Sequence, residues 1–335
     1  MILEFSDAQE LLRGRAEDFA TQVVASAAPG IDESDRIPAE LIRQAASLGL
    51  TAIALPAVSG GGGHDDIATL AALEALARAS AAVALIVGLN HLVARVVDRF
   101  GTPSQRERWF QGLIDGNVRG AVVVGDQPLS SSQASDGIRV RNIRATWVAN
   151  LQSADLALFV EPGLRSDVPG DVWLLSMADV GIRREDRHDP LGLRGAGWAD
   201  AMADGYRLDP VTRLGWDAAA SGEATEWIRH QACVLSAAVA IGVGRAALAH
   251  AAAYIKAQPE GGSQAARFAL ADAATELDAA WMLALKAASE AEPARPLSAS
   301  MAKLLATEAA GRTCGQVMQL TAPADTYRGS TAERL

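Results

Sequence analysis

The sequence predicts a mainly helical α+β protein in three parts: an N-terminal helical domain over residues 1–118, a small central β-domain over 119–218 and a C-terminal helical bundle over 219–335. Apolar residues recur at helical spacing in the first and last parts, and half of all residues are hydrophobic. The middle part is rich in β-branched residues, glycine and proline, which indicates short strands joined by turns. Helices and strands do not alternate, so a doubly wound parallel sheet is disfavoured.

The N-terminal part predicts a series of helices. Ser6, followed three residues later by Gln9, fits a capping box that opens the first helix. Pro29-Gly30 is expected to end this helix. Pro38 and Gly49 should bound the second helix, because proline favours the first helical turn and glycine the residue after the last. Further helices are expected over residues 67–79, 82–100 and 104–113.

Two features of this part have more than one interpretation. The glycine run Gly60–Gly63 could cradle a phosphate, but it lacks the Lys-Ser/Thr of a P-loop, and we favour a turn. Asn90 and His91 are polar residues inside an apolar helical run. We favour a buried, hydrogen-bonded pair, and the alternative is that they line a ligand cavity.

The middle part of the chain predicts strands, and the C-terminal part predicts long helices. The middle part predicts six or seven strands, including those over residues 119–124, 138–147, 156–160, 172–176, and 206–208 together with Val211. The last part predicts long helices over 223–256, 263–290 and 298–320, and helices of this length usually form a bundle. The polar tail 321–335 is expected to be irregular.

Composition excludes several classes of protein. A net charge of −10 without a basic stripe argues against nucleic-acid binding. Cys233 and Cys314 cannot build a disulfide framework, and the five histidines lack metal-ligand spacing, so no structural metal is expected. Charged residues or histidine interrupt the alanine-rich runs, so no membrane span is expected. The N-terminus lacks the apolar stretch of a signal peptide, which points to the cytoplasm.

One tryptophan stands where the helical part gives way to strands. The stretch Ala145–Asn150 reads Ala-Thr-Trp-Val-Ala-Asn. Trp147 near the end of a strand could be an ordinary core side chain, or its flat ring could form a wall for a planar cofactor. The residues alone leave both interpretations open.

The order of these segments resembles that of the acyl-CoA dehydrogenase family of flavoproteins over almost the whole chain. The motifs that carry the resemblance include Leu55-Pro56 with Gly60–Gly63, Phe100-Gly101-Thr102-Pro103, Leu191-Gly192-Leu193-Arg194-Gly195, Gly242-Val243-Gly244-Arg245 and Glu333-Arg334-Leu335. The resemblance implies the three-domain fold of that family, with a four-helix-bundle type of C-terminal domain that is truncated here. It also implies FAD as cofactor, an acyl-CoA thioester as substrate and an oligomer assembled through the bundle.

The resemblance implies where the flavin would bind. Trp147, Val148 and Ala149 match the family stretch that lies against the flavin ring, although Ala149 replaces the usual hydroxyl residue. Gln127, Pro128 and Ser130 lie in the segment that matches the family's Thr-Glu-Pro loop, and Gln319 matches the glutamine of its Gln-x-His-Gly-Gly segment. The family arginine that meets the FAD diphosphate across a subunit boundary is replaced by Ala257, with Glu260 three residues on, where a carboxylate would repel a diphosphate.

The chain also departs from the family at the catalytic base. The sequence ends at Glu333-Arg334-Leu335, before the family's Tyr-Glu-Gly-Thr segment, and the alternative base position falls on Ala232. Glu223 and Glu226 fit acids of a first helical turn better than a relocated base. No catalytic residue is therefore assigned.

These departures lead to three hypotheses. The first is a subunit of an FAD-dependent acyl-CoA dehydrogenase that introduces the α,β double bond only together with a catalytic paralogue. The second is a non-catalytic scaffold protein that has lost flavin and base. The third is a lone dehydrogenase that uses Glu226 as its base. We rank them in this order, and a homo- or hetero-oligomer is expected under each.

Overall fold

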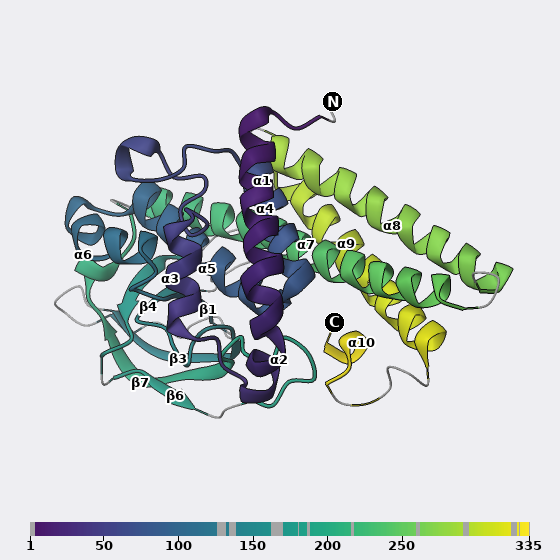
Figure 1. The fold of residues 1–335 in the computed structure, drawn as a ribbon. Coiled ribbons are helices and arrows are strands. Elements are labelled where there is room, and N and C mark those ends of the chain that lie inside the picture. Colours follow the sequence, from purple (N-terminus) through teal and green to yellow (C-terminus); the bar gives the residue numbers. More distant parts are fainter. Residues whose placement is uncertain are drawn as a thin grey trace.

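The structure is a computed structural model that describes residues 4–125, 132–133, 139–161, 170–179, 181–185, 188–215, 218–258, 262–290, 295–322, 327 and 329–334. Helices form the N-terminal part, two small sheets lie beside them, and a helical bundle extends from the other side (Figure 1). The predicted mainly helical α+β class is confirmed.

The chain begins with helix α1 (Asp7–Phe19), which opens with the expected capping box. The Ser6 backbone N–H donates to Gln9 Oε1 at 2.9 Å, and the Gln9 N–H donates to Ser6 Oγ at 3.3 Å. The prediction that Pro29-Gly30 ends this helix is wrong. A π-helical segment (Ala20–Val24) continues α1 into α2 (Ala25–Ser34), and Pro29 lies inside α2. Ala25 and Pro29 are both exposed, so water can satisfy the Ala25 carbonyl that the missing proline N–H leaves without a helical donor.

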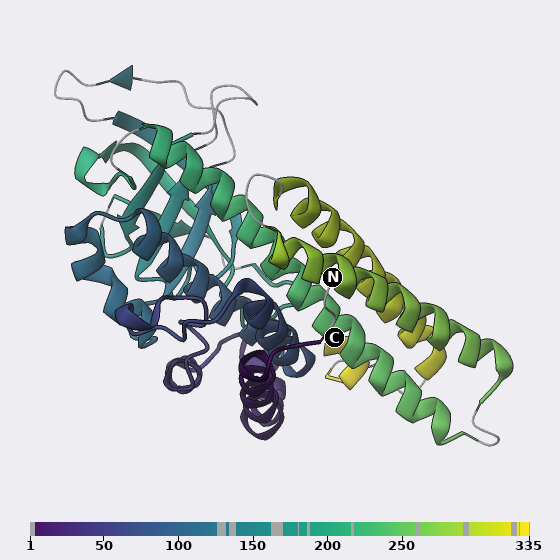
Figure 2. The same cartoon turned by 90° about the horizontal axis from the view of Figure 1, so that it is seen from above.

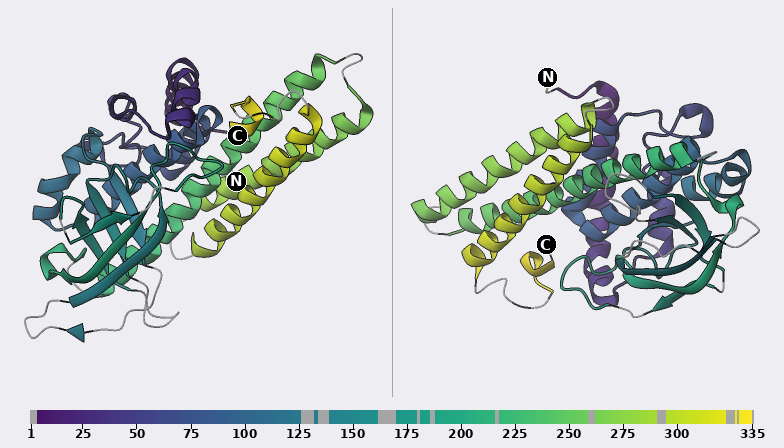
Figure 3. Two further views of the ribbon diagram at one scale, coloured as in Figure 1. Left: turned by 90° about the horizontal axis from the view of Figure 1, so that it is seen from below. Right: turned by 180° about the vertical axis from the view of Figure 1, so that it is seen from behind.

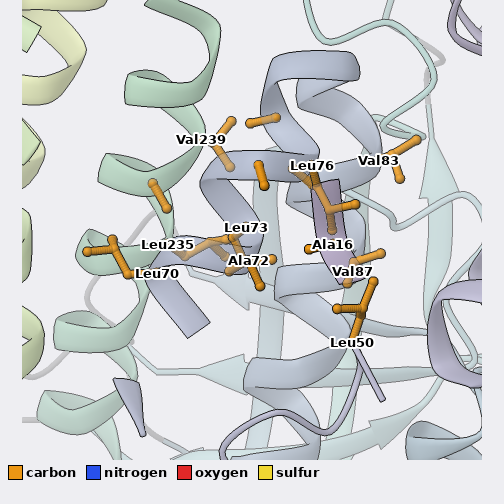
Figure 4. Close-up of a cluster of buried hydrophobic side chains, with 14 of the residues drawn as sticks. Ala16, Leu50, Leu70, Ala72, Leu73, Leu76, Val83, Val87, Leu235 and Val239 are labelled. Carbon is orange, nitrogen blue, oxygen red and sulfur yellow. The ribbon is translucent and has the colours of Figure 1, made fainter. Parts of the chain in front are cut away.

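The remaining N-terminal helices are α3 (Ala39–Ser47), a 3-10 turn (Ala57–Ser59), α4 (Asp66–Ala79), α5 (Ala81–Phe100) and α6 (Pro103–Ile114). Ser80 separates α4 from α5 because its backbone is extended, and its hydroxyl caps α5. Figure 4 shows part of the core that these helices share. Leu70, Leu73 and Leu76 of α4 and Val83 and Val87 of α5 belong to one buried cluster, together with Leu235 and Val239 of the C-terminal part.

The middle part consists of two sheets. The first contains β1 (Gly120–Val124), β4 (Leu156–Val160) and β5 (Val172–Ser176), with β1 parallel to β4 and β4 antiparallel to β5. The second is antiparallel, in the order β2 (Ser132–Gln133), β3 (Arg139–Val148), β7 (Ala199–Leu208) and β6 (Arg183–Glu185). Val211, predicted in a strand, belongs instead to a 3-10 turn (Pro210–Thr212) that proline and an Asp209 cap favour.

The C-terminal part contains α7 (Ala218–Lys256), α8 (Gln264–Ser289), α9 (Arg295–Thr321) and the short α10 (Thr331–Arg334). With 39 residues, α7 is roughly 58 Å long at 1.5 Å per residue. One end of α7 lies beside the sheets, and the other extends with α8 and α9 away from them (Figures 2 and 3). The tail predicted to be irregular therefore carries one short helix.

Among the described residues, two helices are long and apolar enough to pass a length-and-composition test for a membrane span, so interrupting charges alone do not exclude one. These are α5 and residues 222–256 of α7, with mean hydropathies of 1.6 and 1.9. Core helices of other proteins pass the same test, and 78% of the apolar window of α5 is buried inside this protein. Length and composition are therefore weak evidence for a span.

Candidate functional site

The end of β3 presents Trp147 through an irregular backbone. The pairing of β3 with β7 shifts register between Ala145 and Val148, which marks a β-bulge. Within this bulge Trp147 has a φ of 54°, a left-handed conformation that is rare for a bulky side chain. The Trp147 backbone N–H donates to Asp200 Oδ1 at 2.9 Å, so a buried carboxylate on β7 holds the strained residue in place.

The ring of Trp147 is not a core side chain, because 51% of the residue is exposed. His188 stacks on the ring with 3.9 Å between centroids and 17° between planes. Trp198 meets it edge-on at 6.1 Å. Core packing is thus excluded for Trp147, and one flat aromatic group stands partly open at the protein surface.

His188 and Asp200 complete the support of this ring, and sequence reasoning missed both. His188 Nε2 lies 2.6 Å from Asp200 Oδ1, the same oxygen that accepts the Trp147 N–H. Burial alone would raise the pKa of Asp200, but the hydrogen bonds from His188 and the Trp147 backbone outweigh it and hold the pKa below its ordinary value. Trp147 and Asp200 are 53 residues apart, so only the folded chain reveals the group.

The residues after Trp147 connect this aromatic group to the core of the sheets and to the helical core. Val148 is buried in the core of the sheets, while Ala149 packs against the helical core. Asn150 also has a positive φ of 64°, and its side-chain amide donates to the Gly120 carbonyl at 2.8 Å. The stretch is therefore rigidly placed between the two parts of the protein.

Among the other predicted flavin residues that the structure describes, Gln319 lies in a separate hollow that Trp147 does not line. Gln127, Pro128 and Ser130 lie outside the described residues. Gln319 is exposed near the end of α9, where it lines an open hollow of about 540 Å³ with Tyr254, Gln258 and Ser263. This end of the bundle lies away from the sheets in every view (Figures 2 and 3).

The two ends differ in how well they fit FAD. The half-exposed Trp147 ring can stack with a planar isoalloxazine. Among the described residues, the lining of the Gln319 hollow carries hydrogen-bonding groups but no charged side chain, and Ala257 beside it is exposed. The ring end fits the cofactor, whereas the described lining of the Gln319 hollow offers a diphosphate only uncharged partners.

The alternative base position holds no carboxylate. Ala232 is half-buried against the apolar cluster around Trp227 and Ile228. Glu223 and Glu226 are exposed and form ion pairs with Arg99 at 2.9 Å and with Arg229 at 2.8 Å, respectively. These surface contacts do not suit a desolvated general base.

One polar network lies between α4, α5 and α7, close to Ala232 in the chain. Arg95 donates to Asp66 at 2.6 Å and to Gln231 at 3.1 Å, and its guanidinium lies over the Trp227 ring. His91 lines a small hollow of about 20 Å³ here, and burial and the nearby Arg95 charge lower the pKa of His91 to about 3. It is therefore neutral at pH 7.

The structure distinguishes between the interpretations of the Asn90-His91 pair and of the Gly60–Gly63 run. Asn90 is structural, because its side chain bonds Leu113 O and the Gly120 N–H, both at 2.8 Å. His91 reaches only Thr51 O at 3.3 Å, and its Nε2 has no partner among the described residues. The Gly60–Gly63 run forms a turn whose N–H groups all donate to carbonyls of residues 52–57, so none is left for a phosphate.

No metal centre competes with this candidate site in the part of the chain that the structure describes. Its His, Cys, Asp and Glu side chains do not gather in any group of three or more that could hold an ion. The candidate site is therefore the Trp147 platform, formed by Trp147, His188, Trp198 and Asp200.

Known proteins resemble this chain in sequence and in structure. The profile "Acyl-CoA dehydrogenase, N-terminal domain" matches residues 6–117, and "Acyl-CoA dehydrogenase, C-terminal domain" matches residues 224–335. The probable acyl-CoA dehydrogenase YngJ of Bacillus subtilis is 28% identical, over 96% of this chain and 89% of its own. The bovine mitochondrial short-chain specific acyl-CoA dehydrogenase is 25% identical, over 99% of this chain and 85% of its own.

The fold agrees with these matches. The solved structure of butyryl-CoA dehydrogenase from Megasphaera elsdenii superposes with a TM-score of 0.87 at 24% identity, covering 100% of this chain and 92% of that one. The sequence matches of both terminal domains and the overall architecture therefore agree with each other. The chain belongs to the acyl-CoA dehydrogenase family.

Proposed function

We propose that this chain is a flavin-supporting subunit of an FAD-dependent acyl-CoA dehydrogenase and that it works together with a catalytic paralogue. The names of its relatives support acyl-CoA dehydrogenation in general. The observation that carries the proposal is the Trp147 platform, an exposed aromatic ring held in a strained conformation by Asp200 and His188. Strain of this kind persists where surrounding contacts enforce it, and it is common at ligand sites.

Each residue of the platform has a part in this function. Trp147 offers a flat apolar face for the flavin ring, and Asp200 keeps the backbone of the bulge in position. His188 fixes the tilt of the indole by stacking on it. A flavin held here would supply the acceptor for the hydride from the β-carbon of the acyl thioester. Ala149 has no side-chain hydroxyl, so its backbone would be its only hydrogen-bonding group for a bound flavin.

A catalytic paralogue is needed because the reaction requires a general base. Removal of the α-proton requires a carboxylate beside the substrate. Ala232 has none, and the neighbouring glutamates are occupied at the surface. None of these three positions supplies the base, and we assign it to a second, related subunit.

The bundle offers a surface for such a subunit. Leu297, Met301 and Leu304 are exposed by 72%, 48% and 56%, and their spacing places them on one face of α9. Exposed apolar stripes of this kind mark protein–protein contacts. The neutral hollow around Gln319 lies on the same bundle, where the resemblance predicts a flavin contact across a subunit boundary.

The visible spectrum of the purified chain, alone and co-purified with a paralogue, tests the proposal. We expect a flavin-free chain alone, a yellow complex with the paralogue, and acyl-CoA dehydrogenation only by the complex. The Trp147→Ala variant should form the complex but carry less flavin. Activity of the chain alone would contradict the proposal.

A non-catalytic scaffold remains the second candidate, and one observation favours it. His188 already covers one face of Trp147, and no charged side chain lines the Gln319 hollow among the described residues. This alternative predicts a colourless complex that FAD reconstitution does not change.

A further inference from the structure

A cavity of about 530 Å³ lies where the N-terminal helices meet the middle of α7 and the short α10. Its wall includes Leu193, whose carbonyl accepts from Trp198 Nε1 at 3.2 Å, but no residue of the Trp147 platform lines it. Four arginines line it, Arg78, Arg194, Arg245 and Arg334, together with one acid, Asp32. The rest of the wall is mainly alanine from α2, α5 and α7. Its volume falls within the range of small-molecule sites. A cavity with this lining is unusual in a chain of net charge −10.

Two of the arginines share one buried carboxylate. Glu74 is 1% exposed and accepts from Arg78 Nε at 2.8 Å, Arg78 Nη2 at 3.0 Å and Arg245 Nη1 at 3.2 Å. The second partner of Arg245 is Asp278, whose side chain is 74% exposed and therefore well screened by water. This centre leaves about one positive charge uncompensated at the cavity wall.

Arg334 adds a second positive charge. Its guanidinium donates from Nη1 to the Gly329 carbonyl at 2.6 Å, its backbone N–H donates to the Ser330 carbonyl at 3.2 Å, and it has no acidic partner among the described residues. Arg194 is balanced, because its Nε bonds the Asp32 carbonyl at 2.8 Å, the Asp32 carboxylate lies 4.0 Å away, and Asp189 is a further partner. The cavity therefore has a positive excess close to Arg78, Arg245 and Arg334.

Donors remain for a ligand. Arg78 Nη1, Arg245 Nε and Arg334 Nη2 have no hydrogen-bond partner among the described residues, and all three side chains line the same cavity. Guanidinium groups bind phosphate and carboxylate oxygens well because they are always charged and present several N–H groups in one plane. The alanine walls suit an apolar body next to such a head group.

We propose that this cavity binds a small organic anion, with a phosphate or carboxylate head at Arg78, Arg245 and Arg334 and a short apolar body against the alanine walls. The site uses none of the Trp147 platform. Its occupation is therefore measured without flavin or turnover, and it can succeed or fail independently of the proposed function.

Isothermal titration calorimetry of the full chain tests the proposal with three probes: butyl phosphate, pentanoate and inorganic phosphate. We expect one saturable site for butyl phosphate that weakens with added salt, and weaker binding of inorganic phosphate because it lacks the apolar body. Pentanoate separates a carboxylate site from one that needs phosphate. Absence of saturable binding for all three probes would overturn the proposal.

Two variants locate the site. Arg334→Gln should weaken butyl phosphate binding about tenfold, since it removes a charge-assisted donor without breaking an ion pair. Ala249→Phe changes an exposed cavity residue and should block binding sterically while the chain stays folded. Arg312→Gln is the control, because Arg312 pairs with Glu276 and Glu308 outside the cavity, and its affinity should not change. Equal affinity in all three variants would place the anion elsewhere and refute the assignment.

Discussion

The Trp147 platform and the Gln319 hollow correspond to the two ends of one expected flavin site, yet they are built differently. Trp147 is held by a bulge, a carboxylate and a stacked imidazole, at the cost of an unfavourable backbone conformation. The hollow is open, exposed and lined by neutral side chains in the described part of the chain. On the proposed function, the Trp147 platform orients the flavin ring, whereas the described lining of the Gln319 hollow offers no charged side chain to hold a diphosphate.

The largest expected effect comes from removing the platform. Trp147→Ala in the complex with the paralogue should weaken flavin binding by about 3 kcal/mol, roughly 100-fold, because ring stacking is lost. Flavin absorbance after gel filtration measures it. Trp147→Phe keeps an aromatic face and should retain most of the flavin. Equal flavin content in the Ala variant and the parent would mean that the ring does not contact the cofactor.

Removing the support beneath the platform should affect folding in a pH-dependent way. Asp200→Asn should lower the free energy of unfolding by about 2 kcal/mol at pH 7, because two hydrogen bonds to an ionised carboxylate are weakened. The pKa of Asp200 is depressed in the folded chain, so its ionised form stabilises the fold above the ordinary value of 3.8. This stabilisation is lost as the pH falls through the folded pKa.

Urea unfolding at several pH values measures this effect. The gap between Asp200→Asn and the parent should narrow below pH 3.8. Asp204→Asn, on the same strand but exposed, is the matched control and should change less. If the difference in the free energy of unfolding between Asp200→Asn and the parent increases on acidification, ionised Asp200 does not stabilise the fold.

Adding a positive charge beside the Gln319 hollow should strengthen flavin binding there. Ala257→Arg should tighten flavin binding by the complex about tenfold, since a guanidinium adds a charge-assisted contact to the diphosphate. Ala253→Arg places the same charge one turn earlier on an exposed part of α7 and serves as control. If both variants tighten binding equally, general charge attraction accounts for the effect.

Removing the His188 side chain should weaken flavin binding less than removing that of Trp147. His188→Ala removes the stacked ring and should weaken flavin binding by about 1 kcal/mol, roughly fivefold. His188→Phe restores a ring but not the bond to Asp200, so it separates stacking from hydrogen bonding. Near-ultraviolet circular dichroism should report a changed environment of Trp147 in the Ala variant. Tighter flavin binding by His188→Ala would show that the imidazole blocks the cofactor.

The smallest expected effect concerns Glu226. Glu226→Gln should leave the rate of the complex within about twofold, because this glutamate pairs with Arg229 at the surface and a surface pair is worth less than about 1 kcal/mol. Steady-state kinetics measure it. A loss of several hundredfold would identify Glu226 as the base and return a lone dehydrogenase to consideration.

Much of the fold was predictable because it depends on periodicity and caps. The Ser6 capping box and the break at Ser80 follow from local chemistry. The continuation of α2 through Pro29 was not predictable, since a π-helical turn has no clear signal in the sequence. The strand at Arg183–Glu185 was missed because it is short and charged.

The candidate site was predictable only in part. Trp147 could be singled out from its motif, but its exposure could not, because the bulge arises from a register shift between β3 and β7. His188 and Asp200 lie 12 residues apart and meet Trp147 only through tertiary pairing. Nor does local sequence show that Gln319 lies at the far end of the bundle, since this depends on how α7, α8 and α9 pack.

Flavin content per chain in the complex of this protein with a catalytic paralogue, compared with each chain alone, decides whether Trp147 supports a shared flavin site. We expect no retained flavin for this chain alone, stoichiometric flavin in the complex, and its loss when Trp147→Ala is introduced in this chain. Full flavin and acyl-CoA dehydrogenation by this chain alone, or unchanged flavin in the Trp147→Ala complex, would contradict this expectation.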